Sequence, residues 1–143
     1  MSKPFGGSSF LADTSAWGRS NQIEIRTEWL AALRAGQIAT CPVVVMELLY
    51  AARNRDEFDA IDERLRALRD VPVTRSITQA AIAALRELAG TGSGRHRVDT
   101  TDAMIAACAQ EASVGVLHCD RHFDRLAEVM SFESRWLVRV PGV

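Results

Sequence analysis

The sequence predicts one α/β domain in which a mainly parallel sheet is covered by helices on both faces. Short apolar segments alternate along the chain with longer segments of helical periodicity, and this alternation is typical of parallel sheets. The 143 residues are enough for one domain with a substantial core, and 48% of them are hydrophobic. We therefore expect residues 1–143 to form a single domain, with the polar residues 1–8 as a flexible end.

The expected strands are short apolar runs, and two of them end in an acid. The first run ends at Asp13 and a later one ends at Asp120. Side chains that are apolar on both faces indicate strands covered from both sides. The expected strands are residues 9–13, 37–41, 71–74, 114–120 and 136–140.

The expected helices follow from the spacing of apolar residues and from the residues at the helix ends. Ile23, Trp29 and Leu33 lie among charges, and Gly36 ends this helix. Pro42 opens the next helix, because proline is tolerated at the first helical position. The expected helices are residues 21–35, 42–52, 53–70, 76–89, 98–112 and 121–130.

Composition narrows the class of protein. The formal net charge is -1, and Lys3 is the only lysine, since the other sixteen basic residues are arginines. Arginine suits bidentate contacts with phosphate, although genomic base bias produces the same composition. The three cysteines are odd in number and widely spaced, which indicates reduced, buried thiols. Without a signal peptide or a membrane-spanning run, we expect a cytoplasmic protein with no membrane contact.

The segment Val98–Ala109 places two carboxylates three residues apart at the start of a small, apolar helix. Asp99 and Asp102 are expected to project together from its first turn. Two such anions ~4 Å apart repel by about 4 kcal/mol at an effective dielectric of ~20. The helix N-terminus offsets only on the order of 1 kcal/mol of this. Two interpretations remain open: a bound cation, or an N-cap followed by a first-turn acid.

Other acids are expected to converge on the same place. Asp13 and Asp120 fall at strand ends, and ligands of parallel sheets bind outside the carboxyl ends of the strands. The helix of residues 42–52 is apolar on nearly every side, so we expect it to be buried with Glu47 as its single charge. A buried glutamate needs an arginine or a metal as a partner. Four carboxylates without a His or Cys set suit a hard cation such as Mg²⁺ or Mn²⁺.

Four segments in this order resemble PIN-domain ribonucleases, specifically VapC-type toxins of bacterial toxin–antitoxin pairs. They run from Leu11 to Ser15, from Val45 to Ala52, from Asp102 to Ala109 and from Leu117 to Phe123. The resemblance covers about residues 9–125. It implies a mainly parallel five-stranded sheet flanked by helices, and an endoribonuclease that uses Mg²⁺ or Mn²⁺ to hydrolyse RNA phosphodiesters in tRNA or rRNA.

The resemblance also implies roles for particular residues. It assigns the catalytic, metal-holding quartet to Asp13, Glu47, Asp102 and Asp120, with Asp99 as a supplementary metal ligand. It further implies a homodimer, a VapB-type antitoxin that blocks the acidic site, and contact with operator DNA only through that antitoxin.

A second group of residues is considered for contact with RNA. The glycine-rich loop of residues 90–97 ends in Arg95 and Arg97, although a solvated linker has the same composition. Thr14 and Ser15 either donate hydrogen bonds to Asp13 or to phosphate, or cap the following turn. His118 shares a strand face with Asp120, so it either faces the crevice or is a buried histidine bonded to backbone.

Single residues argue against two competing functions. Receiver domains and haloacid-dehalogenase-type phosphatases place a lysine beside the phosphoryl group, whereas the only lysine here is Lys3. Those phosphatases also need a second acid two residues after the first, where this chain has Ser15. The remaining alternative is a catalytically weak RNA- or protein-binding module on the same fold.

Overall fold

The computed structural model describes residues 3–139 and 141–142, and its centre is a five-stranded sheet with the strand order β3-β2-β1-β4-β5. All four strand pairs are parallel. The strands are β1 (Phe10–Ala12), β2 (Ile38–Thr40), β3 (Arg69–Asp70), β4 (Gly115–His118) and β5 (Ser134–Trp136). The predicted parallel sheet is confirmed, and it is parallel throughout.

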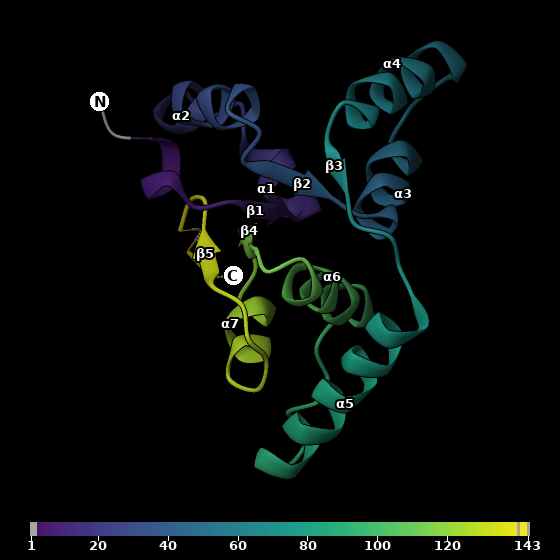
Figure 1. Ribbon diagram of the computed structural model, residues 1–143, viewed down its shortest axis with the longest axis vertical. Coiled ribbons are helices and arrows are strands. Elements are labelled where there is room, and N and C mark those ends of the chain that lie inside the picture. The colour runs from purple at the N-terminus through teal and green to yellow at the C-terminus, as the bar shows by residue number, and fades with distance from the viewer. Residues whose placement is uncertain (1–2, 140, 143) are drawn as a thin grey trace.

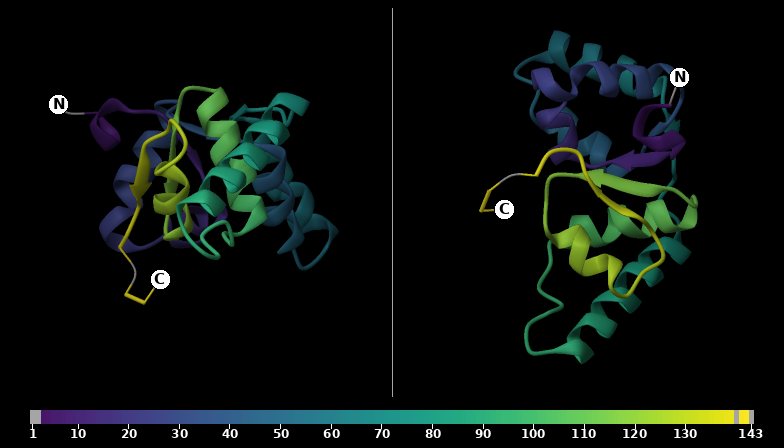
Figure 2. Two further views of the ribbon diagram at one scale, coloured as in Figure 1. Left: turned by 90° about the horizontal axis from the view of Figure 1, so that it is seen from below. Right: turned by 90° about the vertical axis from the view of Figure 1, so that its left-hand side faces the viewer.

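Helices cover both faces of the sheet, as expected (Figure 1). One face packs against α1 (Thr14–Arg19), α2 (Ile23–Arg34) and the 3-10 turn at Pro4–Gly7. The other face packs against α3 (Pro42–Tyr50), α5 (Arg75–Thr91), α6 (Thr100–Glu111) and α7 (His122–Ala127), while α4 (Arg55–Arg66) contacts α3. The right-hand view in Figure 2 shows the strands between these two layers.

The strand side chains alternate between the two cores. Leu11 and Val116 point into the core under α5 and α6, whereas Phe10 and Leu117 point into the core under α2. Gly115 is required at the start of β4, because a Cβ there would lie 2.7 Å from the Phe10 ring and 2.8 Å from the carbonyl oxygen of residue 133. The central strands are therefore packed tightly from both sides.

Several element boundaries differ from those expected. The helix expected over 53–70 ends at Arg66, and β3 lies at residues 69–70 instead of 71–74. Both residues of β3 are exposed and charged, which is common in an edge strand. Exposed charged residues are also typical of a helix surface, so the local sequence pattern favoured a helix here. The last strand lies at 134–136 instead of 136–140, and residue 140 is outside the described residues. The short helix α1 was not expected.

The helix α3 is not buried on every side. Val44 is its one fully buried residue, whereas Met46 and Tyr50 are 63% and 92% exposed. The prediction of a buried helix was wrong because apolar composition on all sides does not show which side meets the core. In the described chain, one side of α3 faces α4 and α6 and another side is open to solvent.

The expected flexible end packs on the domain from residue 4 onward. Phe5 is buried, and its ring meets Phe10 edge-to-face with centroids 6.1 Å apart. Its backbone N–H donates to Glu28 Oε2 over 3.0 Å. The Gln37 side-chain amide donates to the carbonyl oxygens of residues 4 and 8. These contacts hold residues 4–8 against α2 and β2.

No helix in the described ranges has the length and apolar character to cross a membrane. The three cysteines, Cys41, Cys108 and Cys119, are free and buried, as predicted.

Candidate functional site

Asp13 stands where β1 ends and α1 begins. It is 5% exposed and caps α1, with its Oδ2 accepting the N–H of Ser15 over 3.1 Å and the Ser15 hydroxyl over 2.6 Å. The Ser15 hydroxyl also accepts the N–H of Cys119 over 2.9 Å. Ser15 thus holds the Asp13 carboxylate and the end of β4 together. Burial raises the pKa of Asp13, against the lowering effect of these hydrogen bonds.

Asp120 lies beside Asp13 because β1 and β4 are neighbours. The N–H of Asp13 donates to the carbonyl of Leu117 over 2.9 Å, which continues the ladder to the strand ends. The strand order reverses between β1 and β4, and such a switch point opens a crevice at the carboxyl edge. The sequence-based expectation that these two acids meet at one edge agrees with this placement.

Asp102 and Asp99 differ in role although both belong to the start of α6. Asp99 is the N-cap, and its exposed carboxylate accepts the N–H and the hydroxyl of Thr101 over 2.9 and 2.7 Å. These bonds, the hydroxyl's first, lower the pKa of Asp99. Asp102 is in the first helical turn and only 6% exposed. The two carboxylates are close enough for the charge of Asp99 to raise the pKa of Asp102, while the cap bonds hold the Asp99 carboxylate against Thr101.

The buried Asp102 has the largest pKa shift among the acids of the site. Its pKa is raised to about 9, first by burial and then by the charges of Asp13, Asp120, Asp99 and Glu47. Every other acid predicted for the site therefore raises the pKa of this one carboxyl group. The protonated form is favoured at Asp102 because burial and the neighbouring negative charges both disfavour its carboxylate.

Glu47 approaches the same place from α3. Its Oε1 accepts the hydroxyl of Thr14 over 3.0 Å. Burial raises the pKa of Glu47, and the charges of Asp13 and Asp99 add to this while the Thr14 bond opposes it. Thr14, like Ser15, holds a carboxylate of the site, so the structure favours the positioning role for both residues over direct contact with phosphate.

Arginine and lysine do not neutralise this group within the described residues. The arginine ion pairs found there join surface residues, and only His122 pairs with an acid of this group, at Asp102 and Asp120. The arginine partner considered for Glu47 is therefore absent from the described ranges. Oxygen donors without a compensating cation are the donor set that Mg²⁺ and Mn²⁺ bind, so the residues fit a divalent ion.

His122 is a site residue that the sequence reasoning missed. Its Nδ1 lies 3.3 Å from Asp102 Oδ2 and 3.8 Å from Asp120 Oδ1. Ligand atoms of these three residues all lie within 4.8 Å of one another. The signal available in the sequence was the two-residue spacing of Asp120 and His122. The backbone N–H two residues after an aspartate commonly donates to its carboxylate, as it does here over 2.9 Å.

His118 is buried completely and does not face the crevice. Its Nδ1 accepts the N–H of Asp120 over 3.1 Å, and its Nε2 lies 2.7 Å from the Ser134 hydroxyl. Asp124 accepts that hydroxyl over 2.7 Å. Burial lowers the pKa of His118 to about 4, so its ring is neutral near pH 7. His118 cannot reach RNA from this position; it supports the turn that carries Asp120, with Asp124 behind it.

The two arginines of the 90–97 loop have different surroundings. Arg95 forms an ion pair with Glu128, the residue at the C-terminal end of α7. Arg97 is exposed and forms no ion pair among the described residues. Arg97 is therefore the better placed of the two for binding a phosphate chain.

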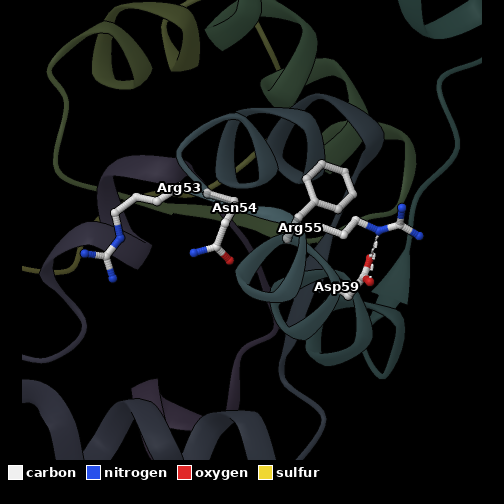
Figure 3. A pocket seen from close by; sticks show the side chains of 6 residues that line it. Arg53, Asn54, Arg55 and Asp59 are labelled. Carbon is white, nitrogen blue, oxygen red and sulfur yellow. Dashed lines mark hydrogen bonds and ion pairs between the residues drawn. The ribbon is translucent and has the colours of Figure 1, made fainter.

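A separate shallow hollow lies where the chain passes from α3 to α4 (Figure 3). Arg53, Asn54, Arg55 and Asp59 line it, and Arg55 pairs with Asp59. None of the four predicted carboxylates lines this hollow, so it is distinct from the acidic group.

Fold and site together define an α/β domain whose parallel sheet gathers buried, uncompensated carboxylates at its switch point. The family model for the PIN domain matches residues 10–129. The chain belongs to the PIN domain family, as the resemblance indicated.

Its relatives are VapC proteins. It is 37% identical to Ribonuclease VapC18 of Mycobacterium tuberculosis over 90% of this chain and 95% of the relative. It is 30% identical to Ribonuclease VapC51 of the same organism, over 90% and 93% of the two chains. A crystal structure of VapBC-5 from M. tuberculosis has a TM-score of 0.63 at 26% identity, covering 93% of this chain and 99% of the other. DNA-bound VapBC from Salmonella typhimurium has the same fold, with a TM-score of 0.71 at 18% identity over 92% and 99%.

Replacing Asp102 by asparagine is expected to stabilise the metal-free protein. Between about pH 4 and pH 9, folded Asp102 keeps a proton that the unfolded chain has released, so the free energy of unfolding falls as pH rises. Asp102→Asn should raise the free energy of unfolding at pH 8 by about 1–3 kcal/mol and flatten this pH dependence. Urea unfolding between pH 5 and pH 9 measures both effects.

The matched control is Asp56→Asn, which changes an exposed aspartate on α4 and should leave the pH dependence as in the parent. Equal or lower stability of Asp102→Asn at pH 8 would contradict the electrostatic description of the site.

Proposed function

We propose that this protein is a divalent-metal-dependent endoribonuclease, the toxin of a VapBC-type pair, which hydrolyses phosphodiesters of tRNA or rRNA and so inhibits translation. The observation that carries the proposal is the convergence of Asp13, Glu47, Asp102 and Asp120 without an arginine or lysine partner among the described residues. The likeness to Ribonuclease VapC18 supports the choice of RNA as substrate. Residues 1–143 act as one catalytic domain in this proposal.

The carboxylates are assigned as the ligands of Mg²⁺ or Mn²⁺. When bound, such an ion neutralises charge on a phosphodiester and makes water a stronger nucleophile. The chain supplies fixed oxygen atoms for it: Ser15 orients Asp13 and Thr14 orients Glu47 through the hydrogen bonds described above. Asp99 contributes negative charge from its capping position.

Glu47 is also suited to move a proton. Only its Oε1 accepts the Thr14 hydroxyl, which leaves Oε2 for a water molecule approaching phosphorus. Water would attack phosphorus in line with the leaving oxygen and pass a proton to Glu47, while the P–O bond to the leaving oxygen breaks and that oxygen takes up a proton from solvent. No covalent intermediate with the enzyme forms.

Partner proteins belong to the same proposal. A cognate VapB-type antitoxin would cover the acidic site, and the complex would contact operator DNA only through the antitoxin. The structural relatives support this, since they are VapBC complexes and one of them is bound to DNA. On this chain, the exposed Met46 and Tyr50 lie on the helix that carries Glu47 and offer apolar surface to an antitoxin or to the second copy of a homodimer.

Cleavage of total RNA tests the activity. The parent protein should cut RNA with Mg²⁺ or Mn²⁺ and not with EDTA, and Asp13→Asn or Asp102→Asn should slow cleavage by about 100-fold or more, because each removes a charged ligand oxygen. Asp56→Asn is the matched control and should cut like the parent. Binding of RNA by the parent without any cleavage would favour the binding-module alternative instead.

Arg97 is expected to contribute more to RNA binding than Arg95. In the cleavage-deficient Asp102→Asn background, adding Arg97→Ala should weaken RNA binding and reduce the slope of log affinity against log salt by about 1. Adding Arg95→Ala should change the slope less, because Glu128 already pairs with that guanidinium. Fluorescence anisotropy across salt concentrations measures this. Identical slopes for the background and for the added Arg97→Ala change would refute the role of Arg97.

A further inference from the structure

The Nδ1 atom of His122 is about as far from two carboxylates as the ligand atoms of one metal ion are from each other. Neighbouring ligand atoms about 2.1 Å from an octahedral ion lie about 3 Å apart. The His122 Nδ1 atom lies 3.3 Å from Asp102 Oδ2 and 3.8 Å from Asp120 Oδ1. Small side-chain shifts would bring all three atoms onto one ion.

A hydrogen bond reveals which nitrogen of the His122 ring carries a lone pair. The backbone N–H of Asp99 points to Nδ1 over 3.2 Å, and a backbone N–H only donates. Nδ1 is therefore the acceptor, without a proton of its own. A ring nitrogen has one lone pair, so an ion bound between Nδ1, Asp102 Oδ2 and Asp120 Oδ1 would take the place of the Asp99 N–H at that lone pair.

The position of the ring is set by the backbone. The N–H of His122 donates to Asp120 Oδ1 over 2.9 Å, which fixes the first turn of α7 against that carboxylate. The side chain is 30% exposed, so an ion from solvent can reach it. Among the described residues, the ring of His122 is the one hydrogen-bond partner of the Asp102 carboxylate.

We propose that His122 Nδ1 is a metal ligand together with Asp102 and Asp120, and that this nitrogen makes the site prefer Mn²⁺ to Mg²⁺. The inference rests on the proposed metal-dependent function and adds a ligand and a metal preference to it. Mg²⁺ binds oxygen and gives up its water reluctantly, whereas imidazole suits transition metals. An all-carboxylate site would lack this discrimination.

Metal binding in the absence of RNA tests the proposal by isothermal titration calorimetry with MnCl₂ and with MgCl₂. The parent is expected to bind Mn²⁺ at least about 10-fold more tightly than Mg²⁺. In His122→Asn the amide oxygen can still accept the Asp99 N–H, but the ligand nitrogen is gone. This variant should lose about 10-fold in Mn²⁺ affinity while Mg²⁺ affinity changes little. His96→Asn, at an exposed histidine of the 90–97 loop, is the matched control and should bind both ions like the parent.

Pulsed electron paramagnetic resonance of the Mn²⁺ complex gives a direct signature of the ligand. Modulation of the electron spin echo by a directly bound ¹⁴N nucleus should be present in the parent and in His96→Asn, and absent in His122→Asn. An unchanged ratio of Mn²⁺ to Mg²⁺ affinity in His122→Asn, or an echo without nitrogen modulation in the parent, would overturn the inference.

Asp102→Asn separates this failure from a failure of the proposed function. If Asp102→Asn binds both ions as the parent does, the carboxylates are not the metal site and the proposed function fails with the inference. If Asp102→Asn abolishes binding but His122→Asn keeps the parent's ratio, only the role of His122 is refuted.

Discussion

The constraint on which the site depends is a carboxylate that the fold buries without a counter-charge. Asp102 is almost inaccessible, and the nearby acids raise its pKa to about 9. Such an arrangement costs stability in a metal-free protein, since each acid destabilises the charged form of its neighbours. The chain does not relieve this with arginine, although it contains sixteen of them. A metal ion that bridges the carboxylates offsets the free-energy cost of their repulsion. The group of acids therefore lowers the stability of the metal-free protein but serves the proposed function.

The sheet topology creates this arrangement from residues more than a hundred positions apart. The neighbouring parallel strands β1 and β4 end just before Asp13 and two residues before Asp120, and α6 brings Asp102 over the same edge. Hydroxyl groups then fix the geometry. Ser15 joins the Asp13 carboxylate to the end of β4, and Thr14 ties α1 to Glu47 on α3. The hydroxyl groups that hold Asp13 and Glu47 thus belong to the two residues that follow Asp13, and they join the end of β1 to α3 and to the end of β4.

The sequence predicted the parts of the fold and site that depend on local pattern, and failed where contacts between distant segments decide. Alternating apolar segments were sufficient to predict the sheet, and strand-end acids were sufficient to bring Asp13 and Asp120 together. By contrast, β3 consists of two exposed charged residues and is defined by its pairing with β2, which no local pattern reveals. His118 and His122 are both compatible with either a buried or a site position by sequence. Only the packing of β5 and Ser134 on His118, and the approach of α6 to α7, decide that the second histidine and not the first faces the acids.

A crystal structure of the protein grown with Mn²⁺, with anomalous diffraction recorded near the manganese absorption edge, tests the central claim most directly. The arrangement of the carboxylates predicts an anomalous peak within about 2.3 Å of oxygens of both Asp102 and Asp120. A map without a peak at the carboxyl edge, or one in which an arginine fills the space between the acids, would contradict it.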